Sequence, residues 1–127
     1  MIERFGSGGS WEARVGYSRT VRAGDLVLVA GCTATGPDGA IVGGASVHEQ
    51  AAQALRNIAA ALELAGCGLE DVVRTRIYLT DIARWEEAGR AHGEVFGDIR
   101  PVTTMVEVSA LIDPRMLVEV EAEAYAP

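Results

Sequence analysis

The sequence contains no lysine, so all eleven of its positively charged side chains are arginines, against 18 aspartates and glutamates. The formal charge is therefore −7 at pH 7. An acidic surface repels phosphate backbones, because nucleic-acid binding depends largely on lysine and arginine neutralising phosphates. We therefore expect no nucleic-acid partner.

Cysteine, histidine and long apolar runs are also scarce. Cys32 and Cys67 are the only cysteines, and the two histidines are far apart, so neither a disulfide framework nor a metal-ligand spacing is present. No stretch reaches the roughly 18 apolar residues that a membrane span needs. Residues 1–14 also have no apolar core of signal-peptide length. We expect a cytoplasmic protein with reduced thiols, no metal and no membrane partner.

The bulk composition suits one ordinary domain. The chain has 127 residues, of which 49% are hydrophobic and 23% charged. A chain of this length buries roughly two-thirds of its unfolded surface, so it needs no disulfide or metal to fold. We predict a single domain over residues 1–127, in which residues 1–13 form a polar, glycine-rich lead segment.

The secondary-structure signals alternate between strands and helices along the chain. Apolar and β-branched runs between turn residues predict five strands, at about 17–22, 26–31, 71–81, 102–111 and 116–124. The run LVLVAG at 26–31 is apolar at every position, which is typical of a strand covered on both faces. A second predicted helix, about 82–96, follows Asp81 as its N-cap and ends at Gly97.

The first helix has the clearest signals. Ser46 and Glu49 fit a capping box, and Gly66 is a C-terminal stop. Between them, apolar residues recur at helical spacing: Val47, Ala51, Ala54, Leu55, Ile58, Ala61, Leu62 and Ala65. The order β-β-α-β-α-β-β predicts an α+β domain, with a mixed sheet and two helices on one face.

Two rows of charge share the strand period. Glu119, Glu121 and Glu123 alternate with small apolar residues, and Arg74 and Arg76 have the same spacing on an earlier strand. If the two strands are neighbours, the rows form cross-strand ion pairs of about 0.2–1 kcal/mol each. The row of glutamates then has a structural role. This leaves open the alternative that one of its members lies at the end of a cleft and acts as an acid.

Three segments in this order resemble the Rid family, also called YjgF or L-PSP: GYSRTVRAGDLVLVAGCTATGPDG, AAQALRNIAAALELAGCGLEDVVRTRIYLTDIARWEE and RPVTTMVEVSALIDPRMLVEVEA. The resemblance covers residues 15–124. It implies a chorismate-mutase-like fold and a homotrimer whose sheets form an inner barrel, with ligands bound in clefts between subunits. It also implies hydrolysis of reactive imines and enamines, such as 2-aminoacrylate, without a cofactor.

The family's site residues match this sequence only in part. Active relatives carry P-x-R-[ST] at the start of the fourth predicted strand, where the arginine grips the substrate carboxylate. Thr103 occupies the arginine position here. The small hydroxyl residue of the family is replaced by Ala30, and its asparagine aligns with Gly89. The tyrosine and the glutamate are kept, as Tyr17 and Glu119.

Glu119 is the predicted catalytic residue. Imine hydrolysis needs water and a group that moves protons, and a carboxylate whose pKa is raised by burial can hold that water. The alternative is an ionised, structural member of the charged row. Tyr17 is a predicted ligand-binding residue through its hydroxyl, or else a strand residue that covers an edge.

Five further residues are candidate ligand contacts. Thr103 and Thr104 offer hydroxyls, although threonine is also a common strand residue. Gly31 and Cys32 lie at a strand end where family ligands bind, and a packed, inert cysteine is the alternative for Cys32. Arg100 is a candidate replacement for the missing cation, or a surface arginine. His92 fits a core or interface position better than a catalytic one.

Two functional hypotheses follow. The first is a cofactor-free deaminase of reactive imines or enamines whose substrate differs from 2-aminoacrylate, because Thr103 replaces the family arginine. The second is a non-enzymatic trimer that binds a small molecule in the cleft between subunits. Ribonuclease activity is an older label of the family, and the negative charge and the lack of a His/Lys cluster argue against it.

Overall fold

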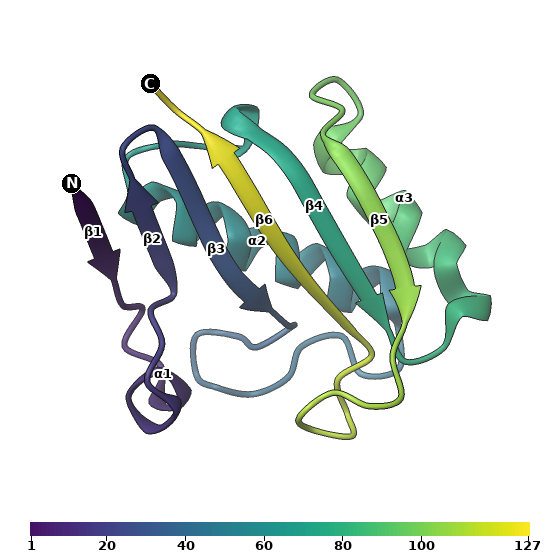
Figure 1. Ribbon diagram of the computed structural model, residues 1–127. Coiled ribbons are helices and arrows are strands. Elements are labelled where there is room, and N and C mark those ends of the chain that lie inside the picture. The colour runs from purple at the N-terminus through teal and green to yellow at the C-terminus, as the bar shows by residue number, and fades with distance from the viewer.

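The computed structural model describes all 127 residues and contains one six-stranded mixed sheet (Figure 1). The strands lie in the order β1-β2-β3-β6-β4-β5. Only the pair β4–β5 is parallel, and the other neighbours are antiparallel. Their bounds are β1 Ile2–Phe5, β2 Thr20–Ala23, β3 Leu26–Cys32, β4 Val72–Leu79, β5 Val102–Glu107 and β6 Val118–Tyr125.

Two helices, α2 (Val47–Leu64) and α3 (Trp85–Phe96), cover one face of the sheet. Figure 1 shows both helices behind the strands, and the face toward the viewer carries no helix. We call this uncovered side the open face. The predicted α+β architecture, with its mixed sheet and two covering helices, is confirmed.

Helix α2 forms as its sequence signals predict. The Ser46 side chain accepts a hydrogen bond from the Glu49 backbone N–H at 3.1 Å, and Gly66 takes the left-handed conformation just beyond the helix. The predicted apolar stripe is buried against the sheet, with Ala54, Ile58 and Leu62 fully enclosed. Small side chains in this stripe let the helix pack closely on β3 and β6.

Helix α3 begins later than its sequence predicts. Asp81 accepts a hydrogen bond from the Ala83 backbone N–H, as an N-cap does, but residues Ile82–Arg84 form a 3-10 turn before α3 starts at Trp85. Ala88 and Phe96 are buried, and Trp85 is exposed. The helix therefore starts three residues later than predicted and still connects β4 to β5.

The lead segment contains two elements that sequence analysis missed. Strand β1 pairs with β2 at the sheet edge, and α1 (Ser10–Val15) follows it. Four residues at an exposed edge carry no readable hydrophobic period, and a six-residue helix carries barely more. The element order therefore has one strand and one short helix ahead of the predicted hairpin.

Strand β3 is covered on one face only within the chain. Val27 and Val29 are buried under α2, whereas Leu26 and Leu28 are each 40% exposed on the open face. The continuous apolar run led us to expect cover on both sides, but both helices lie on the same side.

Buried Gln50 fixes the loop before α2 to the start of β6. Its amide nitrogen donates to the Gly44 and Arg115 carbonyls at 2.7 and 2.9 Å, and its oxygen accepts from the Leu117 N–H at 2.9 Å. Both polar atoms of this buried amide would be costly to bury unpaired, so its three hydrogen bonds specify the junction. It sets where β6, with its row of glutamates, enters the sheet.

Candidate functional site

The predicted charge rows meet on the open face. Strands β4 and β6 are neighbours, and their register pairs Arg74 with Glu123 and Arg76 with Glu121. Arg74 lies 3.5 Å from Glu123, and Arg76 lies 3.3 Å from Glu123 and 3.7 Å from Glu121. The cross-strand ion pairs that the sequence predicts are therefore present.

Glu119 stands outside these pairs. Its register partner on β4 is Tyr78, whose hydroxyl donates to Glu121 instead. The ion pairs of the open face involve Glu121 and Glu123 and leave the Glu119 carboxylate out. Glu119 is thus the free member of the row, at the end nearest the start of β6.

The Glu119 side chain lies against Gly31 of β3. A Cβ at position 31 would lie 2.8 Å from the Glu119 Cδ, which is closer than side-chain atoms pack. Gly31 does not have a positive φ, so glycine is favoured here by the close approach of Glu119 and not by its conformation, since a larger residue would displace the end of the Glu119 side chain. The bare backbone at Gly31 is the seat of the carboxylate.

The seat makes Glu119 a weaker acid. Burial raises the pKa of Glu119 above its usual value of 4.5, the nearby Arg19 guanidinium opposes the rise, and Glu121 adds to it. A carboxyl group with a raised pKa holds and releases a proton closer to neutral pH. This environment agrees with the predicted catalytic role of Glu119, which stays a prediction.

Arg19 joins several of the predicted residues. Its guanidinium donates to the Gly31 carbonyl at 2.7 Å, to the Tyr17 hydroxyl at 3.1 Å and to the Cys32 Sγ at 3.4 Å. Tyr17, Gly31, Cys32 and Glu119 therefore lie around one arginine. Sequence analysis missed Arg19, although its position two residues after Tyr17 places both on one face of an extended segment.

Cys32 is enclosed and stays a thiol. It is 5% exposed, and burial raises the pKa of its thiol despite the opposing charge of Arg19. A reactive cysteine needs a lowered pKa and access to solvent. The surroundings of Cys32 therefore fit the inert, packed alternative.

Thr103 faces the helix side of the sheet. Its hydroxyl bonds to the Thr75 hydroxyl at 2.8 Å, and the same Thr75 hydroxyl bonds to His92 Nε2 of α3 at 2.8 Å. Burial lowers the pKa of His92, which fits its neutral role in this network. Glu119 lies on the open face, so within one chain the sheet separates Thr103 from it.

Two other candidates lie away from Glu119. Thr104 pairs in register with Arg76 and is exposed on the open face at the edge strand β5. Arg100 has a left-handed backbone, and its Nε donates to the Gly97 carbonyl at 3.0 Å, so within the chain it caps the end of α3. Their predicted ligand contacts stay predictions.

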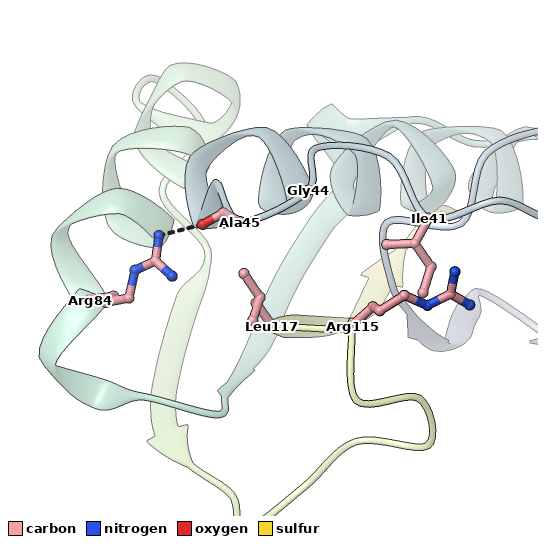
Figure 2. A pocket seen from close by; sticks show the side chains of 6 residues that line it. All are labelled: Ile41, Gly44, Ala45, Arg84, Arg115 and Leu117. Carbon is pink, nitrogen blue, oxygen red and sulfur yellow. Dashed lines mark hydrogen bonds between the residues drawn. The ribbon is translucent and has the colours of Figure 1, made fainter.

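A separate hollow of about 320 Å³ opens at the end of the sheet (Figure 2). Its walls are the loop before α2, the turn before α3 and the turn before β6, and it contains none of the predicted site residues. Arg84 donates to the Ala45 carbonyl and pairs with Glu87, while Arg115 pairs with Asp113. Both guanidiniums are thus neutralised, and we do not assign ligand binding to the hollow.

The chain has no group of three or more histidine, cysteine, aspartate or glutamate side chains that could hold a metal ion. None of its helices combines the length and the hydropathy that crossing a bilayer requires.

Comparison with known proteins identifies the class. The family model described as Endoribonuclease L-PSP matches residues 9–126. A crystal structure of Rv2704 from Mycobacterium tuberculosis, described as a member of the YjgF/YER057c/UK114 family, is 53% identical, with a TM-score of 0.89 over 99% of this chain and 100% of that one. The chain belongs to the Rid family, also known as YjgF or L-PSP.

More distant relatives agree with this assignment. An uncharacterised protein from Streptomyces coelicolor is 43% identical over 98% of this chain and 92% of its own length. A RutC family protein from Pyrococcus horikoshii is 39% identical over 86% of each chain. The YjgF gene product of E. coli has a TM-score of 0.79 at 27% identity, and the alignment covers 86% of this chain and 87% of that one.

The seat of Glu119 generates a prediction about stability and pH. Because folding raises the pKa of Glu119, its contribution to stability is fully present below the unfolded value of 4.5 and is lost as the pH rises through the folded value. The Glu119→Gln variant should therefore unfold at a higher denaturant concentration than the wild-type protein at pH 7–8. This difference between the two unfolding midpoints should shrink toward pH 4.

Glu121→Gln is the matched control for this measurement. It removes a carboxylate that accepts from Tyr78 and pairs with Arg76, so it should lower the free energy of unfolding by up to about 1 kcal/mol. A Glu119→Gln variant that is less stable than wild type at pH 7 would show that the folded protein favours the charged form of Glu119.

Proposed function

We propose that this protein is a cofactor-free hydrolase of small reactive imines and enamines, and that it acts in the cytoplasm as a homotrimer. Family membership supports the reaction class. The observation that carries the proposal is the half-buried Glu119 carboxylate, which has no ion pair and lies on bare backbone at Gly31. The two free cysteines agree with a reducing compartment.

The chemistry needs one proton carrier and one water molecule. The Glu119 carboxylate takes a proton from water as the water oxygen bonds to the imine carbon, and the resulting carboxyl group passes that proton to the imine nitrogen, which gives a neutral carbinolamine. The carboxylate then takes the proton of the carbinolamine hydroxyl and passes it to the amine nitrogen as the C=O bond forms, the C–N bond breaks and ammonia leaves. A raised pKa suits both steps, because the same group must accept and donate near neutral pH.

The trimer supplies what one chain lacks. Leu26 and Leu28 on β3, and Val102 and Val106 on β5, leave apolar side chains exposed on the open face. Such surface favours burial against another copy. A neighbouring copy would also bring its β5 edge toward Glu119, which is the route by which residues 103 and 104 reach the site. Light scattering should give three times the 13.4 kDa of one chain.

The substrate we propose lacks a carboxylate handle. Thr103 stands where active relatives carry an arginine, and its hydroxyl is bonded to Thr75. Arg74 and Arg76 of the open face are paired with glutamates. An uncharged imine therefore fits this site better than an amino-acid-derived one such as 2-aminoacrylate.

A non-enzymatic role in ligand binding is the second candidate. The loss of the carboxylate-gripping arginine favours it, because a site without that grip can retain binding and lose turnover of the family's usual substrate. The two candidates differ in one observable, which is the decay rate of an imine in the presence of the protein.

We predict that the wild-type protein accelerates the decay of at least one uncharged imine generated in the assay, followed by carbonyl formation. Glu119→Gln should lower kcat/KM about 100-fold or more, since it removes the proton carrier. Gly31→Ala should lower it about tenfold to 100-fold, because the new methyl group pushes the carboxylate off its seat while keeping its charge.

The matched control is Glu123→Gln, which changes a glutamate of the same strand that is paired with Arg74 and Arg76. Its kcat/KM should stay within about threefold of wild type, as surface ion pairs contribute little. If no imine in a panel with varied substituents decays faster with wild-type protein, the hydrolase proposal is wrong and the binding role stands.

We also predict that Thr103→Arg creates or raises activity on carboxylate-bearing imines such as 2-aminoacrylate. A bidentate arginine–carboxylate pair contributes about 1.5–3 kcal/mol, so KM should fall roughly 10- to 100-fold. Thr103→Lys is the control, and it should give a smaller gain because a point charge lacks the fork. Equal kinetics for wild type and Thr103→Arg would mean that position 103 does not reach the ligand.

A further inference from the structure

Arg19 is a largely enclosed arginine whose partners are mostly uncharged groups of the site. Its side chain is 16% exposed. One terminal nitrogen, Nη1, donates to the Ala30 and Gly31 carbonyls at 3.1 and 2.7 Å and lies 3.4 Å from the Cys32 Sγ. This nitrogen therefore fixes the irregular end of β3, where the pairing with β6 shifts its register between Val29 and Cys32.

The other terminal nitrogen holds Tyr17. Nη2 donates to the Tyr17 hydroxyl at 3.1 Å, and the guanidinium carbon lies 5.4 Å from the centre of the Tyr17 ring. The contact with the ring is a cation–π interaction, and together with the hydrogen bond it sets both the position and the tilt of the ring. The guanidinium thus orients the one aromatic hydroxyl among the predicted ligand contacts.

Glu12 of the lead segment forms an ion pair with Arg19. Arg19 Nε lies 3.7 Å from Glu12 Oε2 of α1, and Glu12 is 8% exposed. Glu12 also accepts hydrogen bonds from the Ser7 N–H and hydroxyl. Burial alone would raise the pKa of Glu12, but the Ser7 hydrogen bonds and the charge of Arg19 lower it, so Glu12 stays a carboxylate that anchors the guanidinium.

From these contacts we propose that Arg19 is a positioning residue: its guanidinium holds the Gly31 backbone and the Tyr17 hydroxyl in the arrangement that seats Glu119. The role rests on the function proposed for Glu119. Arg19 lies just before β2 and Glu119 lies on β6, and the first contacts the Gly31 carbonyl while the second lies over its Cα. A shift of the Gly31 peptide would therefore move the seat of the carboxylate.

A direct role as the clamp of a ligand carboxylate fits these contacts poorly. A bidentate grip uses two parallel N–H groups. The Nη1 donors are taken by the β3 carbonyls, one Nη2 donor is taken by Tyr17, and Nε faces Glu12. Only one hydrogen of Nη2 is left, whereas a bidentate grip needs two N–H donors.

The test measures Glu119 itself before any activity. Side-chain ¹³C-labelled glutamate gives a carboxyl titration by NMR, and Glu119→Gln assigns the signal. The groups around Glu119 are Arg19, Cys32 of β3, Glu121 of its own strand and Tyr78 of β4. Arg19→Gln should move the Glu119 midpoint to higher pH, because an opposing positive charge is lost.

Arg22→Gln is the matched control. Arg22 lies on β2, just after Arg19, and also donates to backbone carbonyls, those of Ala65, Gly24 and Ala126, but it is not among the charges that shift the pKa of Glu119. It should destabilise the fold in a similar way and leave the Glu119 midpoint in place. An unchanged midpoint in Arg19→Gln, or an equal change in Arg22→Gln, would overturn the proposal.

Arg19→Lys separates charge from geometry. It keeps the positive charge, so the Glu119 midpoint should stay nearer wild type than in Arg19→Gln, but it cannot span Gly31 and Tyr17 at once. The Tyr17 ring signals should therefore shift in Arg19→Lys. Tyr17 signals identical to wild type would overturn the positioning role, and this variant carries the test if Arg19→Gln does not fold.

Kinetics then distinguish the role from that of a clamp. A positioning residue predicts a fall of about tenfold to 100-fold in kcat for both Arg19 variants, with KM nearly unchanged. A rise in KM confined to carboxylate-bearing imines would identify a clamp and contradict the proposal. If no imine is hydrolysed, the proposed function fails, and the titration and the Tyr17 signals still decide how Arg19 acts.

Discussion

The close approach of the Glu119 carboxylate to the bare backbone of Gly31 is the constraint on which the site depends. Any side chain at position 31 would occupy the space that the carboxylate now fills. Because the seat is backbone and not a cation, Glu119 is half buried without an ion pair, and burial raises its pKa. The missing Cβ at position 31 thus leaves room for the carboxylate, and the resulting burial makes Glu119 a weaker acid.

The rest of the open face makes this possible by satisfying every other charge nearby. Arg74 and Arg76 are taken by Glu121 and Glu123, so no guanidinium of β4 is left for Glu119. The nearest guanidinium, that of Arg19, donates instead to the Gly31 carbonyl and the Tyr17 hydroxyl. Around Gly31 the structure therefore brings together bare backbone, the Tyr17 hydroxyl held by Arg19, and a carboxylate without an ion pair.

The sheet, its covering helices and the paired charge rows could be predicted from the sequence, because they depend on periods of two and 3.6 residues and on a capping serine. The site roles of Glu119 and Tyr17 come from family resemblance and stay predictions. Strand β1, helix α1 and the contacts of Arg19 could not be predicted from the sequence. Short edge elements have no period, and the partners of Arg19 are backbone carbonyls that any residue could supply. That Thr103 faces the helix side depends on register with β4, which strand spacing alone leaves open.

The measurement that tests the central claim most directly is the carboxyl titration of Glu119 in the wild-type protein, followed by ¹³C NMR. With the carboxylate seated on Gly31 and unpaired, its midpoint must lie above the usual value of 4.5. A midpoint at or below that value would mean that Glu119 is a paired, structural member of its row, and the site described above would have no proton carrier.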